Sequence, residues 1–479
     1  MTWSPVFLPL ESMMSVKRKR VLFVAYLFPP VGGVGVHRAA KFVKYLPHFG
    51  WDCSVLTASN PSAPLFDESL LKDIPAETII RKARTYEPGY AMKNMVSASH
   101  GDAAAAGIKS RILGGVKTLV RSVSNFVLQP DPQILWRPQA LKAGLQLLRE
   151  VPHDAIIATG PPFSSFLVGA ALSRKTGVPL MLDYRDEWSI SNAYWENKKQ
   201  GRLANWIQTR MQRKAVLAAK SLLATTPSSA AAVAEFARGV GCTAPATHIY
   251  NGFDPDDFVT HEATPIIKRD YGRGTNLYRM SFVGTLWNLN SIAPLVDAIC
   301  QLAVTQPQLM NHLELVCAGR KTADQEAQLD RLHGLPCHVV RLPFVEHSEA
   351  VQLMRASDSL LMLNTDLPET RRIINAKTFE YMAAKRPVFV VAPDGDVWDI
   401  MRDLPGTVLC APADGTKIRD RLALESERHR CGVHHDDDYW DIHRFERRHL
   451  AGELADWLDR MTESVRASSI ITPTEPRRS

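Results

Sequence analysis

The sequence of 479 residues lacks the features that mark several large classes of protein. Its seven cysteines are scattered and form no C-x-x-C pair, which fits a reducing compartment and gives no support to a zinc site. The apolar run at 21–28 is too short to cross a bilayer and the residues before it have no continuous apolar core, so we expect neither a spanning helix nor a cleaved signal. No solenoid or propeller repeat is visible, and no cluster of basic and aromatic residues indicates nucleic-acid binding. These absences favour a globular protein of the cytoplasm.

What the sequence contains is an ordinary globular composition, with 45% hydrophobic and 22% charged residues. A chain of this length exceeds what one hydrophobic core usually organises, so we expect two domains of about 200 residues each. The formal net charge of +7 suggests an anionic partner, for which a nucleotide, a phospholipid and a nucleic acid are the candidates.

Two successive series of apolar, strand-like runs alternate with helical patterns. The first series is RVLFVAYLF (20–28), DCSVLTAS (52–59), DAIIATG (154–160), PLMLDYRD (179–186), SLLATT (221–226) and ATHIYNG (246–252). The second series is RMSFVGT (279–285), LELVCAG (313–319), CHVVRL (337–342), SLLMLN (359–364) and RPVFVVA (386–392). Two such series predict an α/β protein with two Rossmann-like parallel sheets and a cleft between them. Ligands of open α/β sheets gather at the carboxyl ends of the strands, so the loops there are the candidate site.

The pattern also predicts where the parts of the chain begin and end. A segment with two prolines and several charges, about 251–274, is the expected connection between the domains. The predicted parts are an amino-terminal domain over 1–255, a carboxyl-terminal domain over 275–435, a helical segment over 436–465 and a disordered tail over 466–479.

A glycine-rich loop, FPPVGGVGVHR (28–38), lies between the first apolar run and a helical pattern. Glycines such as Gly32 and Gly33 at a strand-to-helix turn let a phosphate or carboxylate approach the helix amino terminus, although a tight corner alone would explain them equally well. The third glycine of the dinucleotide fingerprint is replaced by Arg38, which argues against a classical NAD site. We expect the loop, with His37 and Arg38 one helical turn further on, to face the cleft.

Several motifs occur in order along nearly the whole chain. They are FPPVGGVGVHR (28–38), TGPPFSSFLVGAAL (159–172), DYRDEW (183–188), IYNGFDPDDF (249–258), FVGT (282–285) and AKTFEYMAAKRPVF (376–389). In order and spacing they resemble the family 4 retaining glycosyltransferases. The resemblance implies the GT-B fold, in which two Rossmann-like domains face each other across a cleft and a carboxyl-terminal helix returns to the amino-terminal domain.

The resemblance also implies a donor site in the carboxyl-terminal half. Glu380 corresponds to the glutamate that binds the nucleotide ribose, although a surface helix residue is the alternative. The helix amino terminus near Thr378 and Phe379 can hold the diphosphate. Two lesser candidates complete the site: the loop of Gly284 and Thr285 would bring backbone close to the diphosphate, and Phe344 would pack near the base unless it serves the core.

The sequence departs from the family pattern at two places. Family members often carry a second glutamate eight residues before the first, where this chain has Arg372. Relatives also usually carry a basic pair after the glycine of the FVGT motif, but TLWNLNSIAP has no arginine or lysine. Lys377 or Arg320, with its neighbour Lys321, could replace that charge, since both loops follow strands; a solvated surface cation is the alternative for each.

In the amino-terminal half, DYRDEW ends an apolar strand. Asp183 and Asp186 could orient hydroxyls of the acceptor or the sugar, with Arg185 paired to one of them or to an anionic substrate. A structural ion pair at the strand end is an equal alternative. By resemblance we expect sugar transfer with retention through a front-face displacement, which requires no metal and no cofactor beyond the nucleotide-sugar co-substrate.

The segment 108–128 has an apolar helical stripe whose only charges are basic. Such a helix either packs on its own domain or lies on an anionic bilayer. The second possibility implies a cytoplasmic protein peripheral to the inner face of the membrane, with a glycan or lipid-linked glycan acceptor for surface polysaccharide. The competing functions are a nucleotide-sugar epimerase of the same fold and a catalytically impaired scaffold protein.

Overall fold

The computed structural model describes residues 18–63, 65–87, 128–194, 201–259, 277–433 and 440–471, and every structural statement below concerns these ranges. The predicted amphipathic segment 108–128 lies outside them, apart from its last residue. Of the tail predicted over 466–479, residues 466–471 instead belong to the last helix, and residues 472–479 lie outside the described ranges.

The amino-terminal domain is built on a parallel sheet of seven described strands in the order β3-β2-β1-β4-β5-β6-β7. The strands are β1 (Lys19–Val24), β2 (Trp51–Ala58), β3 (Ile79–Ala83), β4 (Ala155–Gly160), β5 (Leu180–Tyr184), β6 (Ser221–Ala224) and β7 (Ala246–His248). Strands β2, β4, β5 and β6 are almost completely buried, as expected for continuous apolar runs in a sheet that is covered on both faces.

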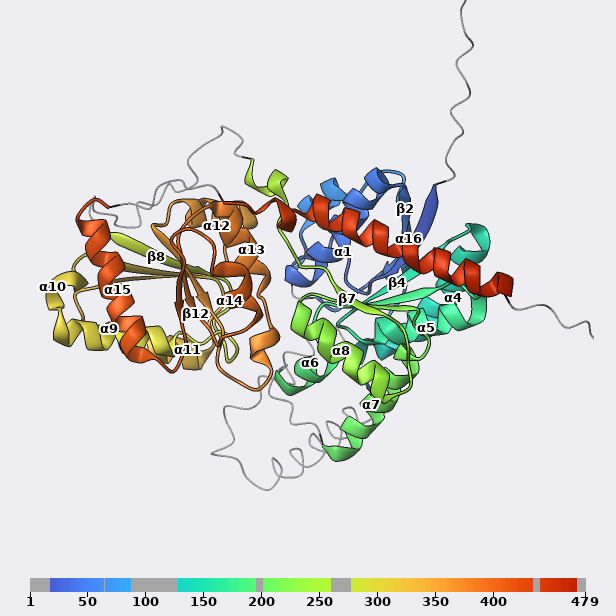
Figure 1. Cartoon of the computed structure of the whole chain (residues 1–479), viewed down its shortest axis with the longest axis horizontal. Helices are drawn as coiled ribbons and strands as arrows, with labels where there is room; N and C mark the ends of the chain where they lie inside the picture. The colour runs from blue at the N-terminus through green and yellow to red at the C-terminus, as the bar shows by residue number, and fades with distance from the viewer. Residues whose placement is uncertain are drawn as a thin grey trace, which may run out of the picture.

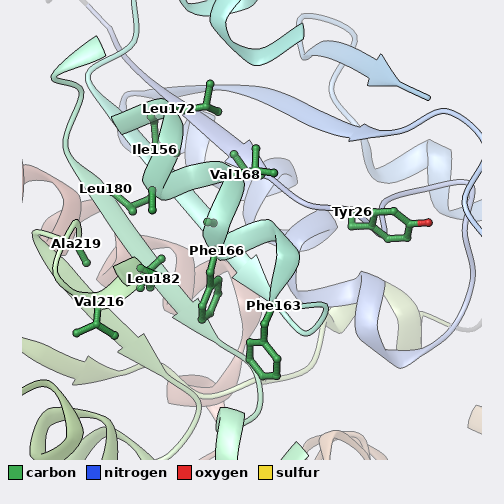
Figure 2. Close-up of a cluster of buried hydrophobic side chains, with 14 of the residues drawn as sticks. Tyr26, Ile156, Phe163, Phe166, Val168, Leu172, Leu180, Leu182, Val216 and Ala219 are labelled. Carbon is green, nitrogen blue, oxygen red and sulfur yellow. The ribbon is translucent and has the colours of Figure 1, made fainter. Parts of the chain in front are cut away.

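Helices cover both faces of this sheet (Figure 1). They are α1 (Val34–Tyr45), α4 (Arg137–Glu150), α5 (Ser164–Thr176), α6 (Trp188–Tyr194), α7 (Arg202–Val216) and α8 (Pro227–Gly239), with short 3-10 turns η1 (Leu46–Phe49), η2 (Glu68–Asp73), η3 (Pro132–Trp136) and η5 (Pro255–Phe258). Figure 2 shows part of the core on one face, where Phe163 and Phe166 from the start of α5 lie beside Leu182 of β5. Phe163 stacks on Trp188 with ring centroids 4.3 Å apart, which anchors the start of α6.

The carboxyl-terminal domain repeats the plan with six described strands in the order β10-β9-β8-β11-β12-β13, again all parallel. The strands are β8 (Tyr278–Val283), β9 (Leu313–Ala318), β10 (His338–Leu342), β11 (Ser359–Leu363), β12 (Val388–Val391) and β13 (Val408–Cys410). The helices are α9 (Ala293–Thr305), α10 (Pro307–Met310), α11 (Ala323–Asp330), α12 (His347–Arg355), α13 (Ala376–Ala384), α14 (Asp396–Met401) and α15 (Gly415–Arg430), with 3-10 turns η6 (Thr370–Arg372) and η7 (His443–Phe445). Two separate hydrophobic clusters, one on each face of the sheet, form its core.

The last helix, α16 (Arg447–Ile471), returns to the amino-terminal domain and lies along it (Figure 1). Its apolar side chains Leu450, Leu454 and Leu458 join the core that α1 and the first strands form. Asp459 of α16 also accepts hydrogen bonds from Lys19 Nζ at 2.8 Å and Trp51 Nε1 at 2.9 Å. This confirms the architecture that the motifs imply, with two parallel-sheet domains and a helix that crosses back.

The predicted strand runs each contain an observed strand, whereas two observed strands were not predicted. These are β3 and β13, which lie at edges of their sheets. β3 carries Arg81 and Lys82 and β13 has only three residues, so neither shows the long apolar run of a central strand.

Candidate functional site

The carboxyl ends of strands from both sheets meet where the two domains touch, a region that we call the domain junction. On the amino-terminal side Glu187 follows β5, and Thr226 with Ser228 follow β6. On the other side Arg372 follows β11 and Asp396 follows β12. The guanidinium of Arg372 lies 3.4 Å from the Glu187 carboxylate, and the Thr226 hydroxyl donates to the Arg372 carbonyl at 2.9 Å. The junction therefore lies at the carboxyl ends of the strands, where α/β proteins bind ligands.

One helix amino terminus at the junction is capped from the opposite domain. The carboxylate of Asp396 accepts hydrogen bonds from the backbone N–H of Ser228 at 3.1 Å and from its hydroxyl at 2.6 Å. Ser228 is in the first turn of α8, where an acidic group stabilises unpaired amides and the positive end of the helix dipole. This contact ties the domains together at a fixed point.

On the carboxyl-terminal side, Glu380 and two basic residues form a partly exposed cluster at the start of α13. Lys377 Nζ lies 2.6 Å from Glu380 Oε2, and His347 Nε2, at the start of α12, lies 3.5 Å from Oε1. Burial by itself would raise the pKa of Glu380, but the charge of Lys377 and the hydrogen bond from His347 outweigh it and hold the pKa well below its usual range. Glu380 is therefore ionised and able to accept hydrogen bonds at neutral pH.

The neighbours of Glu380 in the helix differ in what they can offer a ligand. Thr378 is fully buried, and its hydroxyl has no hydrogen-bond partner among the described residues. Phe379 is buried against Tyr250 and Phe445, so its side chain belongs to the core and only its backbone is left to interact.

The loops after β8, β9 and β10 lie side by side because these strands are neighbours in the sheet. Gly319 has a φ of 119°, and a Cβ there would collide with the carbonyl oxygen of Gly284, so the two loops touch through their backbones. Thr285 and Arg320 are exposed in these loops. Phe344, after β10, is 65% exposed and so does not serve the core.

Lys321 is held inside these loops rather than presented to solvent. Its ammonium group donates to the carbonyls of Gly319 at 2.8 Å and Leu342 at 2.7 Å. Partial burial lowers its pKa. Of the two adjacent cations, Arg320 is thus the one that is free to meet a ligand.

On the amino-terminal side, the glycine loop leads into α1 as predicted. Gly33, with a φ of 98°, is the residue before the helix, and Gly32 packs on the side chain of Leu65. His37, four residues after Gly33, has its ring centroid 6.1 Å from that of His347 of the other domain. The predicted loop helix therefore faces the Glu380 cluster across the domain junction.

His37 is held as a neutral imidazole. Burial is the main cause that lowers its pKa from the ordinary 6.5 to about 3, and the positive charge of Arg447 adds to it. Arg447 begins α16 and is 8% exposed, and its Nε and Nη1 atoms have no hydrogen-bond partner among the described residues. Burial lowers the pKa of this guanidinium as well.

Arg38 and Asp183 lie together in the protein interior rather than at an open surface. The Arg38 guanidinium lies 3.1 Å from the Asp183 carboxylate and donates to the carbonyls of Ile249 and Tyr250 at 2.8 and 2.9 Å. The hydroxyl of Thr159 donates to Asp183 at 2.8 Å. With both side chains 3% exposed, the geometry is that of the structural ion pair weighed as the alternative for this motif.

The partner of Asp183 differs from the one that the sequence suggested. Arg185 instead donates to the carbonyl of Pro161 and lies beside Gly35 of α1. Asp186 is exposed. Glu187, the third acid of the motif, reaches the other domain: besides Arg372, it accepts a hydrogen bond from the Ser229 hydroxyl at 2.7 Å, and burial raises its pKa.

Three carboxylates converge behind α1 in an arrangement that could hold a metal ion. The ligand atoms of Asp73, Asp254 and Asp257 lie within 4.8 Å of one another. Lys41 Nζ contacts all three, at 2.7, 2.5 and 3.0 Å, and Lys44 adds a second ammonium. The positive charge that these acids require is therefore supplied by lysine.

Sequence reasoning missed several residues of the junction, among them Glu187, His347 and Asp396. Glu187 lies within the motif DYRDEW, in which the sequence analysis gave a role to Asp183 and Asp186 but not to Glu187. His347 and Asp396 each begin a helix soon after a strand, at the sheet edge where ligands gather, and that position was the available signal. Only the fold shows that they meet residues of the first domain.

Comparison with known proteins matches both halves of the chain. Residues 32–247 match a family model described as a glycosyl transferase 4-like domain, and residues 278–423 match one described as glycosyl transferases group 1. A comparison with curated protein sequences finds no significant match.

Solved structures share the fold at low sequence identity. Anabaena HepE, determined in complex with UDP and glucose, is 16% identical with a TM-score of 0.52, covering 95% of this chain and 100% of that one. Sucrose-phosphate synthase from Thermosynechococcus elongatus is 13% identical with a TM-score of 0.55, covering 95% and 98%. A Listeria monocytogenes protein assigned as a UDP-N-acetylglucosamine 2-epimerase is 11% identical with a TM-score of 0.50, covering 93% and 97%.

Among the helices of the described ranges, none combines the length and the apolar content needed to cross a membrane.

Proposed function

We propose, from the premise that the chain belongs to the family 4-like glycosyltransferases, that it moves a sugar from a nucleotide-diphosphate sugar to a hydroxyl of a glycan or lipid-linked glycan, with retention of configuration. The family makes the chain a glycosyltransferase; the donor, the stereochemistry and the acceptor are our proposal. The acceptor that we favour is one used in surface polysaccharide biosynthesis. The basic amphipathic segment 108–128 of the sequence supports that choice.

The observation that carries the proposal is the ionised Glu380 at the start of α13, opposite His37 of the other domain. We assign to Glu380 the role of binding the ribose hydroxyls. We assign to the first amides of α13, and to the unpartnered hydroxyl of Thr378, the role of binding the diphosphate. Gly284 and Thr285 would allow close backbone approach, and the exposed ring of Phe344 is available to the base. The similarity to a structure determined in complex with UDP supports a nucleotide as the ligand.

The leaving diphosphate requires positive charge. Lys377 sits beside Glu380 and Arg320 is exposed in the neighbouring loop, so we assign this role to both. In the proposed step the bond between the anomeric carbon and the diphosphate oxygen breaks and a bond to the acceptor oxygen forms on the same face. The acceptor proton passes to the departing phosphate oxygen, which leaves no step for a metal ion.

On the acceptor side we assign His37 and Asp186, which are not engaged in buried ion pairs. Neutral His37 can donate a hydrogen bond to a hydroxyl or accept one from it at physiological pH. Asp186 follows β5 and is exposed. Asp183, Arg38 and Arg185 are proposed instead to hold α1 and the strand ends in position.

The test is a thermal-shift comparison of nucleoside diphosphates and nucleotide sugars on the wild type, Glu380→Ala and a control, Glu349→Ala, which removes an exposed acid of α12. A ligand at 100 times its Kd should stabilise the wild type and the control by about 2.7 kcal/mol. Loss of a charged hydrogen-bond acceptor should weaken binding by about 10- to 100-fold. The stabilisation of Glu380→Ala should then fall to between about 1.4 and about 0.4 kcal/mol.

Equal stabilisation of Glu380→Ala and the wild type would overturn the assignment of Glu380. No stabilisation by any nucleotide would favour the scaffold alternative. If nucleotides bind, conversion of the nucleotide sugar to an epimeric product without an acceptor separates the epimerase alternative, which needs no acceptor, from a transferase.

A further inference from the structure

The outer face of α7 carries a regular pattern of apolar and basic residues. Leu203, Trp206, Arg210, Arg213 and Leu217 follow one another at intervals of three and four residues. At 3.6 residues per turn, this spacing places all five on one face of the helix. Leu217 directly follows the last residue of α7 and keeps helical backbone angles.

That face points away from the protein. Leu203 is 57% exposed, Trp206 53% and Leu217 48%, and the arginines between them are also exposed. The opposite face is fixed in the core, where Gln208 is 1% exposed and Val216 fully buried. In Figure 1, α7 lies at the lower edge of the amino-terminal domain. Three large apolar side chains on one helical face thus lie outside the hydrophobic clusters of the described residues.

The charge of this face has one sign. The helix contains no acidic residue, and Arg202 and Lys214 extend the row of cations. Arg174, at the end of α5, donates to the Lys214 carbonyl at 3.3 Å and so adds its charge beside that of α7. The guanidinium of Arg210 lies over the ring of Trp206 at 4.1 Å.

We propose that this face of α7, formed by Arg202, Leu203, Trp206, Arg210, Arg213, Lys214 and Leu217, docks on an anionic phospholipid bilayer. Tryptophan and leucine can bury their apolar bodies at the headgroup level, while arginine and lysine extend their stems over apolar surface and reach the phosphates. A nucleic-acid site would use the cations without needing three exposed apolar side chains. A bilayer can take up both the apolar and the basic residues of one helical face.

The helix is also tied to the predicted acceptor side. Gln208, on the buried face of α7, accepts a hydrogen bond at 2.8 Å from Trp188 Nε1, and Trp188 directly follows Glu187 of the domain junction. The helix that we propose to dock on the bilayer is therefore connected to the loop of Asp186 and Glu187 through this buried hydrogen bond. If the proposed function holds, this arrangement brings a lipid-linked acceptor to that loop; bilayer binding itself does not depend on the reaction.

The experiment is co-sedimentation of the full chain with vesicles of phosphatidylcholine alone or mixed with phosphatidylglycerol. The double variant Leu203→Ser with Trp206→Ser removes apolar contact, and Arg210→Gln with Arg213→Gln removes charge. The control is Val304→Ser, an 83% exposed apolar residue at the end of α9 in the other domain. All affected side chains are exposed, and the nucleotide-induced thermal shift checks that each variant is folded and keeps its donor site.

We expect the wild type and Val304→Ser to bind anionic vesicles and to bind neutral vesicles at least about tenfold more weakly. The serine pair should lose binding by about tenfold or more. Each lost arginine should reduce binding about fivefold, and added salt should weaken the wild type. Unchanged binding of both double variants would overturn the proposal and assign any binding to another segment, such as 108–128. Absence of wild-type binding, or equal binding to neutral vesicles, would overturn it too.

Discussion

The charged residues of α1 and those of α13 lie near the same junction but in very different surroundings. Arg38 and Lys41 of α1 have side chains 3% and 2% exposed, and each contacts carboxylates that are themselves buried. Lys377 and Glu380 of α13 are 26% and 16% exposed, and His347 beside them is 34% exposed. Both regions are rich in charge, but only in the second are the charged side chains partly exposed to solvent.

The difference shows that burial can separate charges that hold the fold from charges that are candidates for binding a substrate. A buried ion pair that loses one member leaves an unsolvated charge, which costs about 3–5 kcal/mol. A pair at the protein surface is worth about 1 kcal/mol or less. Lys377 and Glu380, which are only partly exposed, lie between these two limits. Sequence motifs alone place Asp183 and Glu380 in the same category, and burial separates them.

From this comparison we expect the largest loss of stability in the variant Asp183→Ala. The substitution leaves the Arg38 guanidinium buried without its carboxylate, so the free energy of unfolding should fall by about 3–5 kcal/mol in urea titrations. Nucleotide affinity of the folded fraction should stay close to that of the wild type, because Asp183 lies away from solvent.

The double variant Arg38→Met with Asp183→Leu is the matched control, since it removes both charges. It should recover much of the lost stability. A variant Asp183→Ala that keeps wild-type stability but loses transfer activity would instead make Asp183 a catalytic residue.

A smaller effect should follow from the partly buried imidazole of His37. Its folded pKa of about 3 lies below the ordinary 6.5, so the unfolded chain takes up the proton first as pH falls. The contribution to stability is therefore present above pH 6.5 and is lost progressively toward pH 3. Between pH 7.5 and 5.0 the wild type should lose about 1–2 kcal/mol more than His37→Gln, allowing for partial solvent access.

Urea titrations at the two pH values measure this difference, and His333→Gln, at an exposed position of the other domain, serves as control. The control should lose as much stability as the wild type. The same loss in His37→Gln would show that the imidazole titrates normally.

The smallest effect concerns the cap between the domains. Ser228→Ala removes the hydroxyl that donates to Asp396 but keeps the backbone N–H contact, so the free energy of unfolding should fall by about 1 kcal/mol. Ser69→Ala removes a similar hydroxyl bond to Asp67 on an exposed turn within one domain and should change stability by no more than a few tenths of a kcal/mol. If the two substitutions lowered the free energy of unfolding equally, the hydroxyl contact between the domains would stabilise the protein no more than one on an exposed turn.

Much of the fold could be predicted from the sequence. Central strands such as β4 and β11 are buried on both faces, and this forces continuous apolar runs that are visible in the sequence. Edge strands such as β3 are covered less completely and carry charges, so their pattern is weak.

The candidate site was predictable only in part. Glu380 and the α13 amino terminus follow from local motif and helix position, because both lie within a few residues of one another. The pairing of Arg38 with Asp183 joins residues far apart in the chain, and no spacing rule indicates that Arg38 rather than Arg185 reaches that carboxylate. The same holds for His37 and His347, which lie in different domains.

The sequence by itself determined the two-sheet architecture, the family and the position of the helix that carries Glu380, because hydrophobic periodicity and helix amino termini are local properties of the chain. Only the tertiary structure decided which charges are buried in pairs, that Lys41 fills the cluster of aspartates, and that α7 turns Trp206 outward. Burial and pairing depend on contacts between segments that are distant in sequence. The free energy of burying a charged side chain depends more on those contacts than on the type of residue.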